Sequence, residues 1–325
     1  MGNNITIADV AEALGVSKTT VSRAISGKGR ISEATRQRVL KYIDEHDYKP
    51  NVIARGLAQS KTFNLCVVMP SNYALVDLPF FQEVIAGIQE IAAMNEYDIL
   101  LCICEENDVS SLERILRNGK VDGVVLLRTF LHDAQIELLN EKRTPFVATG
   151  STTYKKVKQV DHDHESACRE LTSLLLMRGM KHIALLGGSE SYVVTQNRYK
   201  GYTEAYEQMQ QNMDESLVYM NLETKPFIDR AVEDAMDKKA DCILCMDDAI
   251  CSQVLRKLRQ EHVKVPDDVK VASFYNSSVL ENSIPSITSL SFNAKELGME
   301  ACKNLLHKSK MKRFRIVRCF LMKSY

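Results

Sequence analysis

From residue 64 onward, short apolar runs alternate with longer stretches of helical periodicity, and this alternation limits the chain to few folds. The runs are NLCVVM (64–69), DILLCIC (98–104), DGVVLL (122–127), PFVAT (145–149), HIALLGG (182–188), SLVYMN (216–221), DCILCM (241–246) and VKVASF (269–274). Helical patterns fit between them, for example at 80–95, 165–178, 195–211 and 247–262. Strands that are apolar throughout predict parallel sheets covered by helices on both faces. Eight such units exceed one comfortable core, so we expect two α/β lobes with a ligand cleft between them or at the strand carboxyl ends.

Residues 6–47 show a different, purely helical pattern. Three short helices fit this stretch, and the connection between the first two is very short. The residues expected to cap them are Thr6 with Asp9, Gly15, Ser17 and Ser32. The pattern predicts an all-α module of the helix-turn-helix kind in front of the α/β body.

The formal net charge of the 325 residues is zero, but the charges are unevenly spread. Residues 1–62 contain ten Lys or Arg and six Asp or Glu, a net charge near +4. The last 19 residues contain seven basic residues and no acidic one, which leaves residues 63–306 near −11. A basic front on an acidic body indicates a polyanion partner for the front, although a basic patch on a solvated face gives the same asymmetry.

Composition also bears on the compartment. The sequence has no run of 18 or more apolar residues, so it predicts no membrane span. Its first ten residues, MGNNITIADV, lack the basic, apolar and small-residue regions of a signal peptide. Nine cysteines, an odd number, without an export signal predict reduced thiols and a cytoplasmic location.

The second helical stretch, VSKTTVSRAISG (16–27), is rich in short hydroxyl side chains and makes a poor core element. In a helix-turn-helix the second helix enters the major groove of DNA. Short side chains there permit close approach and donate to phosphates, while long ones such as Lys18 and Arg23 reach base edges. The alternative is a small helical domain with a solvated polar helix.

The residues match something more specific. The sequence TIADVAEALGVSKTTVSRAISG (6–27), followed by TRQRVLKYIDEHDYKPNVIARGL (35–57), closely resembles the headpiece and hinge of the lactose-repressor/galactose-repressor family of bacterial transcription regulators. The body resembles the same family in PFFQEVIAGI, VDGVVLL, DHDHESA, HIALLGG, NRYKGY and VPDDVKVASF. The resemblance runs from about Ile5 to about Leu306. It implies a homodimeric repressor that binds pseudopalindromic double-stranded operator DNA.

Roles in DNA binding follow from that resemblance. It implies that the base readers are Lys18, Thr19 and Arg23, and that the residues holding phosphates are Thr6, Ser17, Thr20 and Ser22. The hinge residues implied to lie at the DNA are Asn51, Ala54, Arg55 and Leu57. The hinge would fold into a helix only on operator DNA, and Leu57 would wedge into the minor groove at the dyad. Packing of Leu57 onto the body is the alternative.

The body resembles the periplasmic sugar-binding fold, with two lobes and crossovers between them. The likeness implies the domain order 1–50 for the helix-turn-helix, 51–61 for the hinge, 62–160 with 291–325 for one lobe and 161–290 for the other.

The same likeness places effector contacts in the cleft between the lobes. Arg198 in NRYKGY matches an arginine whose planar fork suits sugar hydroxyls or a carboxylate, with a surface salt bridge as the alternative. Asp247 or Asp248 can contact a ligand or cap the helix that begins there. The expected effector contacts are Ser71, Tyr73, Phe81, Arg198, Asp247, Tyr275 and Asn276, with Asn72 and Phe80 beside them. The segment SFYNS (273–277) is similar to the maltose-type regulators, which implies an α-glucoside or another oligosaccharide.

Enzymatic and metal-binding functions find little support. No G-x-S-x-G, Walker or G-x-G-x-x-G pattern is present, so we expect neither catalysis nor a cofactor. The cluster VDHDHE (160–165) looks like a metal site, but strand alternation would send its neighbours to opposite faces, and Asp163 is expected to cap a helix. The pair in CILC (242–245) has redox spacing but is expected in a buried strand. We therefore expect no metal.

The chain ends unusually for the family. It finishes in HKSKMKRFRIVRCFLMKSY (307–325) instead of the usual last strand, and RIVRCFL is the candidate substitute for that strand. Two alternatives to the sugar-controlled regulator remain open on the residues alone: control by a partner protein, and a sugar-sensing module with a non-functional headpiece.

Overall fold

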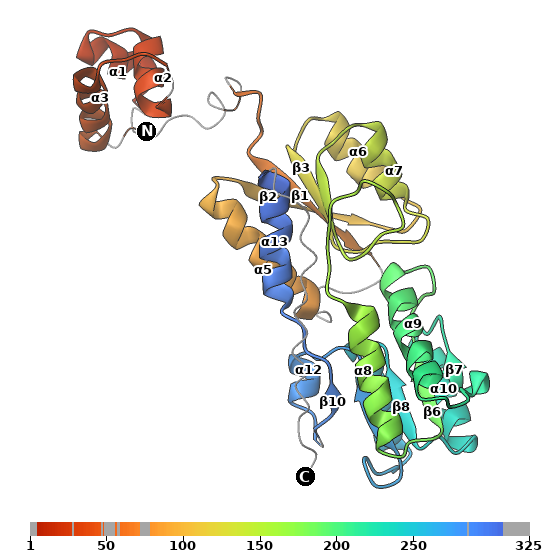
Figure 1. Cartoon of the computed structure of the whole chain (residues 1–325). Coiled ribbons are helices and arrows are strands. Elements are labelled where there is room, and N and C mark those ends of the chain that lie inside the picture. Colours follow the sequence, from red (N-terminus) through yellow and green to blue (C-terminus); the bar gives the residue numbers. More distant parts are fainter. Residues whose placement is uncertain are drawn as a thin grey trace. The chain divides into compact units, whose positions relative to one another are not determined.

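The computed structural model describes residues 5–27, 29–46, 48, 56, 59–71, 79–284 and 286–307. These residues form two compact units that divide between Thr62 and Phe63. Figure 1 traces both units along the chain. No helix among the described residues is long and apolar enough to cross a membrane.

The first unit is a bundle of three helices. Their bounds are Ile7–Leu14 (α1), Lys18–Ser26 (α2) and Glu33–Glu45 (α3). The predicted caps are confirmed: Thr6 and Asp9 form a capping box, Gly15 ends α1 with a φ of 61°, and the side chains of Ser17 and Ser32 accept hydrogen bonds at the starts of α2 and α3. Each cap satisfies backbone groups that a helix end leaves open.

The core of this unit is small but closed. Its fully or nearly buried residues are Val10, Ala11, Val21, Ala24, Val39 and Tyr48. The guanidinium of Arg38 on α3 donates to the carbonyl oxygen of Leu14 at 2.6 Å, which fixes the end of α1 against α3. The predicted all-α helix-turn-helix module is therefore confirmed.

The second unit begins with a parallel sheet of strand order β2-β1-β3-β4-β5. The strands are Asn64–Pro70 (β1), Asp98–Cys104 (β2), Gly123–Leu126 (β3), Phe146–Thr149 (β4) and Gln159–Val160 (β5). The covering helices are Pro79–Met94 (α5), Ser110–Arg117 (α6), Ala134–Glu141 (α7) and Ala294–Leu306 (α13). The helices α5 and α13 pack side by side on one face and α6 with α7 on the other (Figure 1).

Two glycines permit the close crossing of α5 and α13. A Cβ atom on Gly87 would lie 2.0 Å from the carbonyl oxygen of Lys295, and one on Gly298 would lie 2.0 Å from that of Val84. Only glycine fits at these positions, and the two helices therefore pack with their backbones in direct contact.

A second parallel sheet has the order β10-β9-β8-β6-β7. Its strands are Ile183–Leu186 (β6), Val218–Tyr219 (β7), Cys242–Cys245 (β8), Lys270–Ser273 (β9) and Thr288–Ser289 (β10). One face is covered by His164–Met177 (α8) and Val193–Gln208 (α9), the other by Lys225–Asp237 (α10), Asp248–Gln260 (α11) and Ser278–Glu281 (α12). The predicted fold class, two α/β lobes with parallel sheets behind an all-α headpiece, is confirmed.

The chain passes between the two sheets more than once. It leaves the first sheet after β5 and continues into α8, and it returns after β10 into α13. A third link is an antiparallel bridge between Phe130 and Tyr192. In this bridge the amide of Leu131 donates to the carbonyl of Ser191 at 2.9 Å, and the amide of Val193 donates to the carbonyl of Thr129 at 3.2 Å.

One predicted strand is much shorter than expected. Only Val218 and Tyr219 of the run 216–221 pair with β6. The preceding residues Glu215–Leu217 form a 3₁₀ turn because the side chain of Asp214 accepts from the amide of Ser216. The prediction for the start of this strand was therefore wrong, since local capping decides the backbone there.

Candidate functional site

The helix α2 has two distinct faces. Val21 and Ala24 are fully buried in the headpiece core. The predicted base readers and one phosphate residue, Lys18, Thr19, Arg23 and Ser22, are exposed. These four positions recur one turn apart, so they share the face opposite the core. The arrangement leaves two long cationic side chains and two hydroxyls open to a groove.

Three other residues that were predicted to bind phosphate make hydrogen bonds at the starts of α1 and α2. Ser17 Oγ accepts from the amide of Thr20 at 3.1 Å and lies 2.9 Å from its hydroxyl oxygen. Thr6 Oγ1 donates to a carboxylate oxygen of Asp9 at 2.7 Å. Each hydroxyl therefore lies at the amino end of a helix, where unpaired backbone amides favour an anion.

Arg23 lies over a glycine in the turn after α2. Gly29 has a φ of 91°, and a Cβ there would lie 3.1 Å from Arg23 Nε and Cδ. Any larger residue at this position would therefore crowd the arginine. The four hinge residues assigned to DNA, Asn51, Ala54, Arg55 and Leu57, lie outside the described residues.

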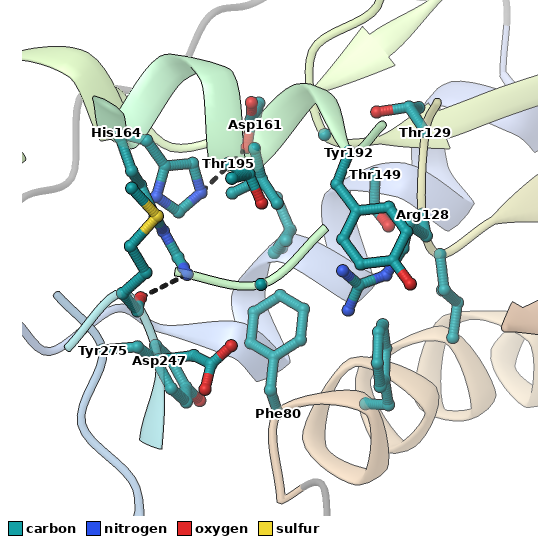
Figure 2. Close-up of a pocket in the computed structure, with 18 of the residues that line it drawn as sticks. Phe80, Arg128, Thr129, Thr149, Asp161, His164, Tyr192, Thr195, Asp247 and Tyr275 are labelled. Carbon is teal, nitrogen blue, oxygen red and sulfur yellow. Dashed lines mark hydrogen bonds and ion pairs between the residues drawn. The ribbon is translucent and has the colours of Figure 1, made fainter. Parts of the chain in front are cut away.

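The second unit contains a pocket between its two lobes, and Figure 2 shows the residues around it. The first lobe contributes Phe80, Phe81, Leu127, Arg128, Thr129, Thr149, Gly150, Asp161 and Leu297. The second contributes His164, Gly188, Tyr192, Val194, Thr195, Arg198, Met246, Asp247, Asp248 and Tyr275. Most of these residues follow the carboxyl ends of parallel strands, where open α/β sheets bind ligands.

The cavity has a volume of about 90 Å³. Aromatic rings line it from both lobes: Phe80 meets Tyr275 with ring centroids 5.4 Å apart and planes at 89°. A compact polar ligand with apolar faces fits such a pocket.

Arg198 projects from α9 toward the carboxyl end of β8. Its Nη1 donates to the carbonyl oxygen of Met246 at 2.5 Å. Its Nε is buried and has no hydrogen-bond partner within the described part of the chain. The guanidinium is therefore fixed on one side and leaves a donor for a ligand on the other, as the fork geometry of arginine allows.

The two carboxylates that follow β8 have different environments. Asp247 caps α11, since its Oδ1 accepts from the amide of Ile250 at 2.8 Å. Asp248 is 5% exposed, and burial raises its pKa to about 6, with a further rise from the negative charge of Asp247. Both line the pocket, so capping and ligand contact are compatible for Asp247.

A second arginine, Arg128, lies at the end of β3 and was not predicted. Its guanidinium carbon stands 4.3 Å from the ring centroid of Tyr192 and 5.3 Å from that of Phe81. Cation–π contacts of this kind hold the guanidinium in a defined plane. Figure 2 shows the Arg128 guanidinium beside the ring of Tyr192.

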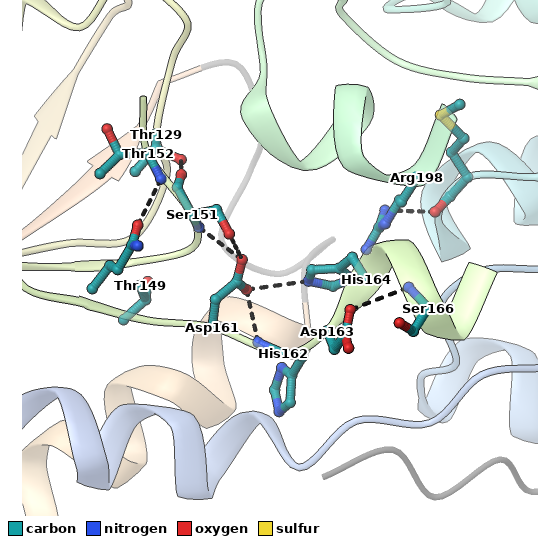
Figure 3. Close-up of polar contacts among 12 residues, drawn as sticks. Thr129, Thr149, Ser151, Thr152, Asp161, His162, Asp163, His164, Ser166 and Arg198 are labelled. Carbon is teal, nitrogen blue, oxygen red and sulfur yellow. Dashed lines mark hydrogen bonds and ion pairs between the residues drawn. The ribbon is translucent and has the colours of Figure 1, made fainter. Parts of the chain in front are cut away.

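A polar cluster surrounds Asp161 at the end of β5. Its Oδ2 accepts from the amide and the hydroxyl of Ser151, both at 2.7 Å, and its Oδ1 lies 3.4 Å from Nε2 of His164 (Figure 3). Burial raises the pKa of Asp161, but the nearby His164 and the hydrogen bonds outweigh burial and hold the pKa below its ordinary value. Burial lowers the pKa of His162 to about 4.

The strand argument used against a metal at this cluster was wrong. β5 ends at Val160, so Asp161 and His162 lie in the turn before α8 and His164 is the first residue of that helix. Side-chain alternation does not apply to a turn. One ligand atom from each of these three residues lies within 4.8 Å of the others. Asp163 caps α8 as predicted, with its side chain accepting from Ser166.

The predicted effector residues fall into three groups. Phe81, Arg198, Asp247 and Tyr275 line the pocket, as do Phe80 and Asp248. Ser71 and Asn276 do not line it: Ser71 is exposed beyond β1, and the Asn276 side chain donates to Glu281 at 2.9 Å. Asn72 and Tyr73 lie outside the described residues, as does the chain from residue 308 to 325.

Sequence reasoning missed the pocket residues that follow β3, β4, β5 and β6. The most polar of them are Arg128, Thr129, Thr149, Asp161 and His164. Their positions directly after apolar runs were the available signal, because carboxyl ends of parallel strands meet at one edge. The CILC pair lies in β8 with both cysteines fully buried, which confirms the prediction of a core strand.

Comparison with known proteins gives a consistent picture. Residues 6–51 match the bacterial regulatory proteins of the lacI family, and residues 172–315 match a periplasmic binding protein-like domain. The HTH-type transcriptional regulator MalR of Streptococcus pneumoniae is 31% identical over 268 residues, which cover 81% of this chain and 82% of MalR. Catabolite control protein A of Staphylococcus xylosus is 29% identical over 290 residues, which cover 88% of this chain and 87% of the relative.

Solved structures extend the likeness to nearly the whole chain. A complex of the transcriptional regulator CelR with cellobiose is 27% identical and superimposes with a TM-score of 0.72, covering 98% of both chains.

Proposed function

Because the chain belongs to the lacI family of bacterial DNA-binding transcription regulators, we propose that it represses sugar-metabolism genes and that a sugar in the cleft controls its affinity for operator DNA. The relatives are transcription regulators, and this chain is likewise a regulator and not an enzyme. The observation that carries the sugar proposal is the pocket in which Arg198, Asp247 and Tyr275 meet aromatic rings of the opposite lobe.

The DNA contacts follow from the faces of α2. In this proposal Lys18, Thr19 and Arg23 read base edges from the exposed face of the helix. Thr6, Ser17, Thr20 and Ser22 hold phosphates, supported by the helix starts at Thr6 and Ser17. The hinge residues Asn51, Ala54, Arg55 and Leu57 complete the contact in the minor groove, and Leu57 wedges between base pairs at the dyad.

A sugar suits the pocket for chemical reasons. Aromatic rings such as Tyr275 offer an apolar face to one side of a pyranose, while Arg198 Nε and the carboxylates after β8 offer hydrogen bonds to its hydroxyls. The solved structure of CelR is a complex with cellobiose, a disaccharide. MalR is a second regulator to which the chain is similar. We therefore propose a β- or α-linked glucose disaccharide, or its monosaccharide unit, as the ligand class.

Two sets of exposed apolar side chains support a homodimer. On the edge strand β2, Leu101 and Ile103 are 49% and 59% exposed. On the layer formed by α10, α11 and α12, Phe227 and Val279 are 52% and 47% exposed. Pairing two copies through such surfaces buries them and places two headpieces on the two halves of a palindrome. Sedimentation of the Leu101→Arg/Ile103→Arg variant tests this, and an unchanged dimer would remove β2 from the interface.

Control of DNA binding would come from the angle between the lobes. A ligand that binds one arrangement of the lobes better shifts the population toward that arrangement. Typical couplings of this kind amount to about 1–3 kcal/mol, or roughly five- to 150-fold in affinity.

The first experiment is operator selection. Purified protein is incubated with a random duplex pool at fixed salt, alone and with maltose, cellobiose or glucose, because affinity for DNA depends strongly on salt. Enrichment of a pseudopalindrome that one sugar abolishes supports the whole proposal. Enrichment that no sugar changes keeps the regulator and transfers control to another effector or to a partner protein, and a pool without enrichment contradicts the DNA-binding assignment of the headpiece.

A further inference from the structure

A buried cluster at the crossover from the first lobe to the second borders the ligand pocket, and the proposed function gives it no role. Asp161, His162 and His164 present one ligand atom each within 4.8 Å of one another. The three residues lie in the turn after β5 and at the start of α8. We propose that this cluster is a binding site for a divalent transition-metal ion of the zinc class.

The spacing between two of these groups already fits a metal. Asp161 Oδ1 and His164 Nε2 are 3.4 Å apart. With metal–nitrogen and metal–oxygen bonds of about 2.1 Å, two ligands of a tetrahedral ion lie about 3.4 Å apart. This pair therefore needs no rearrangement to hold an ion. The three ligand atoms lie within 4.8 Å of one another, so the atom from His162 must approach the other two by up to about 1.4 Å to reach the same geometry.

Both histidines also contain polar atoms that the fold leaves without partners. His162 and His164 are 7% and 6% exposed, and the Nδ1 atoms of both are buried without a hydrogen-bond partner among the described residues. Both rings lean on Phe292, with centroids 4.9 Å from its ring centroid, so the pair is held firmly in place.

The carboxylate is oriented as metal-binding carboxylates are. Ser151 donates to Asp161 Oδ2 from its amide and its hydroxyl, both at 2.7 Å (Figure 3). Oδ1 accepts from the backbone amide of His162 at 2.8 Å and faces His164 Nε2 at 3.4 Å. Outer hydrogen bonds of this kind fix the ligand and are as much part of a metal site as the ligands themselves.

The donor set selects the ion. Two imidazole nitrogens with one carboxylate oxygen suit Zn²⁺, Co²⁺ and Ni²⁺, whereas Mg²⁺ and Ca²⁺ prefer oxygen ligands throughout. Asp161 and His164 also line the ligand pocket, so the remaining coordination position faces the cleft. A bound ion would tie the turn after β5 to α8 and present an open position for water at the pocket wall.

Titration of the metal-free, full-length chain with ZnCl₂ in competition with a chromophoric chelator tests the site. One Zn²⁺ per chain is expected, and the His162→Ala and His164→Ala variants are each expected to bind it at least tenfold more weakly. The matched control is His182→Ala, which removes an exposed histidine far along the sequence from the cluster. Asp161→Asn, which keeps the shape of the side chain and an acceptor for Ser151, is expected to lose affinity as well.

Co²⁺ spectra distinguish this site from the cysteines. The expected visible bands of a nitrogen–oxygen site should appear without a thiolate charge-transfer band, and they should vanish in the double variant His162→Ala/His164→Ala. Thermal unfolding of each metal-free variant checks that it is folded. Equal Zn²⁺ affinity in the wild type and the double variant, or a thiolate band in the wild type, overturns the proposal. Neither result depends on which sugar the cleft binds.

Discussion

Phe80 on α5 and Tyr275 after β9 meet edge to face across the cleft, with their ring planes at 89°. Phe80 packs against the core of the first lobe and also against that of the second. Phe80 therefore contacts both lobes, and a widening of the cleft would separate it from Tyr275.

Replacing Phe80 should weaken sugar binding through this contact. An edge-to-face pair contributes about 0.5–1.5 kcal/mol beyond the area it buries, so Phe80→Ala should lower sugar affinity roughly two- to tenfold. Calorimetric titration with the sugar identified by operator selection measures the change. Met177→Ala, which truncates a 65% exposed side chain on α8, serves as the control and should bind like the wild type. Unchanged affinity in Phe80→Ala would show that the contact does not favour the ligand-bound state.

Arg198 should tolerate no conservative change. Lysine keeps the charge but carries its donors on one nitrogen, so it cannot span the Met246 carbonyl and a ligand as Arg198 Nη1 and Nε do. A hydrogen bond to a charged group contributes about 1.5–3 kcal/mol, so Arg198→Lys should lower sugar affinity roughly ten- to 100-fold. The control is Arg169→Lys, whose guanidinium pairs with Glu204 away from the pocket. Equal losses in both variants would argue for a general effect on folding.

The buried carboxyl of Asp248 should make stability depend on pH. Its pKa is raised from 3.8 to about 6 in the folded chain, so the folded state binds more protons than the unfolded state between these values. The free energy of unfolding therefore falls as the pH rises from about 4 to about 6, by roughly 1–3 kcal/mol. Asp248→Asn should remove this fall and stabilise the chain at pH 7 but not at pH 4.

Urea unfolding at the two pH values measures the effect. Asp237→Asn, at an exposed position on α10, should leave the pH dependence as it is in the wild type. A wild-type slope retained in Asp248→Asn would assign the dependence to other groups.

The crossing of α5 and α13 should be sensitive to a single methyl group. In Gly298→Ala the new Cβ would meet the carbonyl oxygen of Val84, so the helices must separate. Overpacking against backbone should lower the free energy of unfolding by about 3 kcal/mol. Gly188→Ala is a matched control, because a Cβ there has nothing within 4 Å. Similar unfolding midpoints for both variants would mean that the crossing can relax.

Base reading by α2 should depend on Lys18 and not on basic charge in general. Lys18→Ala should change the preferred base at one position of each half-site, since a specific contact to a base edge is worth about 1–3 kcal/mol. Lys41→Ala removes a similarly exposed lysine from α3, where it pairs with Glu45 at 3.7 Å. Operator selection should give the same sequence for Lys41→Ala as for the wild type. An unchanged preference in Lys18→Ala would remove that residue from the base readers.

Patterns that repeat along the chain predicted the fold well. Apolar runs located the strands because parallel strands are buried on both faces, and capping residues such as Ser17 and Ser32 located helix starts because their side chains act locally. The short strand at Val218 was missed in length because Asp214 diverts the backbone just before it.

The pocket was less predictable, since single residues after strands carry no periodic signal. Thr129, Thr149 and Arg128 become neighbours only through the order of the sheet. Likewise, the approach of Gly87 and Gly298 is a property of two helices more than 200 positions apart in the sequence. Such contacts depend on tertiary packing, which local propensity does not encode.

The short bridge between Phe130 and Tyr192 makes the opening of the two lobes measurable by hydrogen exchange. The amides of Leu131 and Val193 donate across the bridge to the opposite lobe, so separation of the lobes breaks both hydrogen bonds and exposes both amides to solvent. The rate of deuterium uptake at these two amides then reports how often the lobes separate, and the measurement needs no label or ligand. A sugar that holds the lobes together should slow exchange at these two amides. The exchange rates of strand amides inside each sheet should stay the same with and without the sugar.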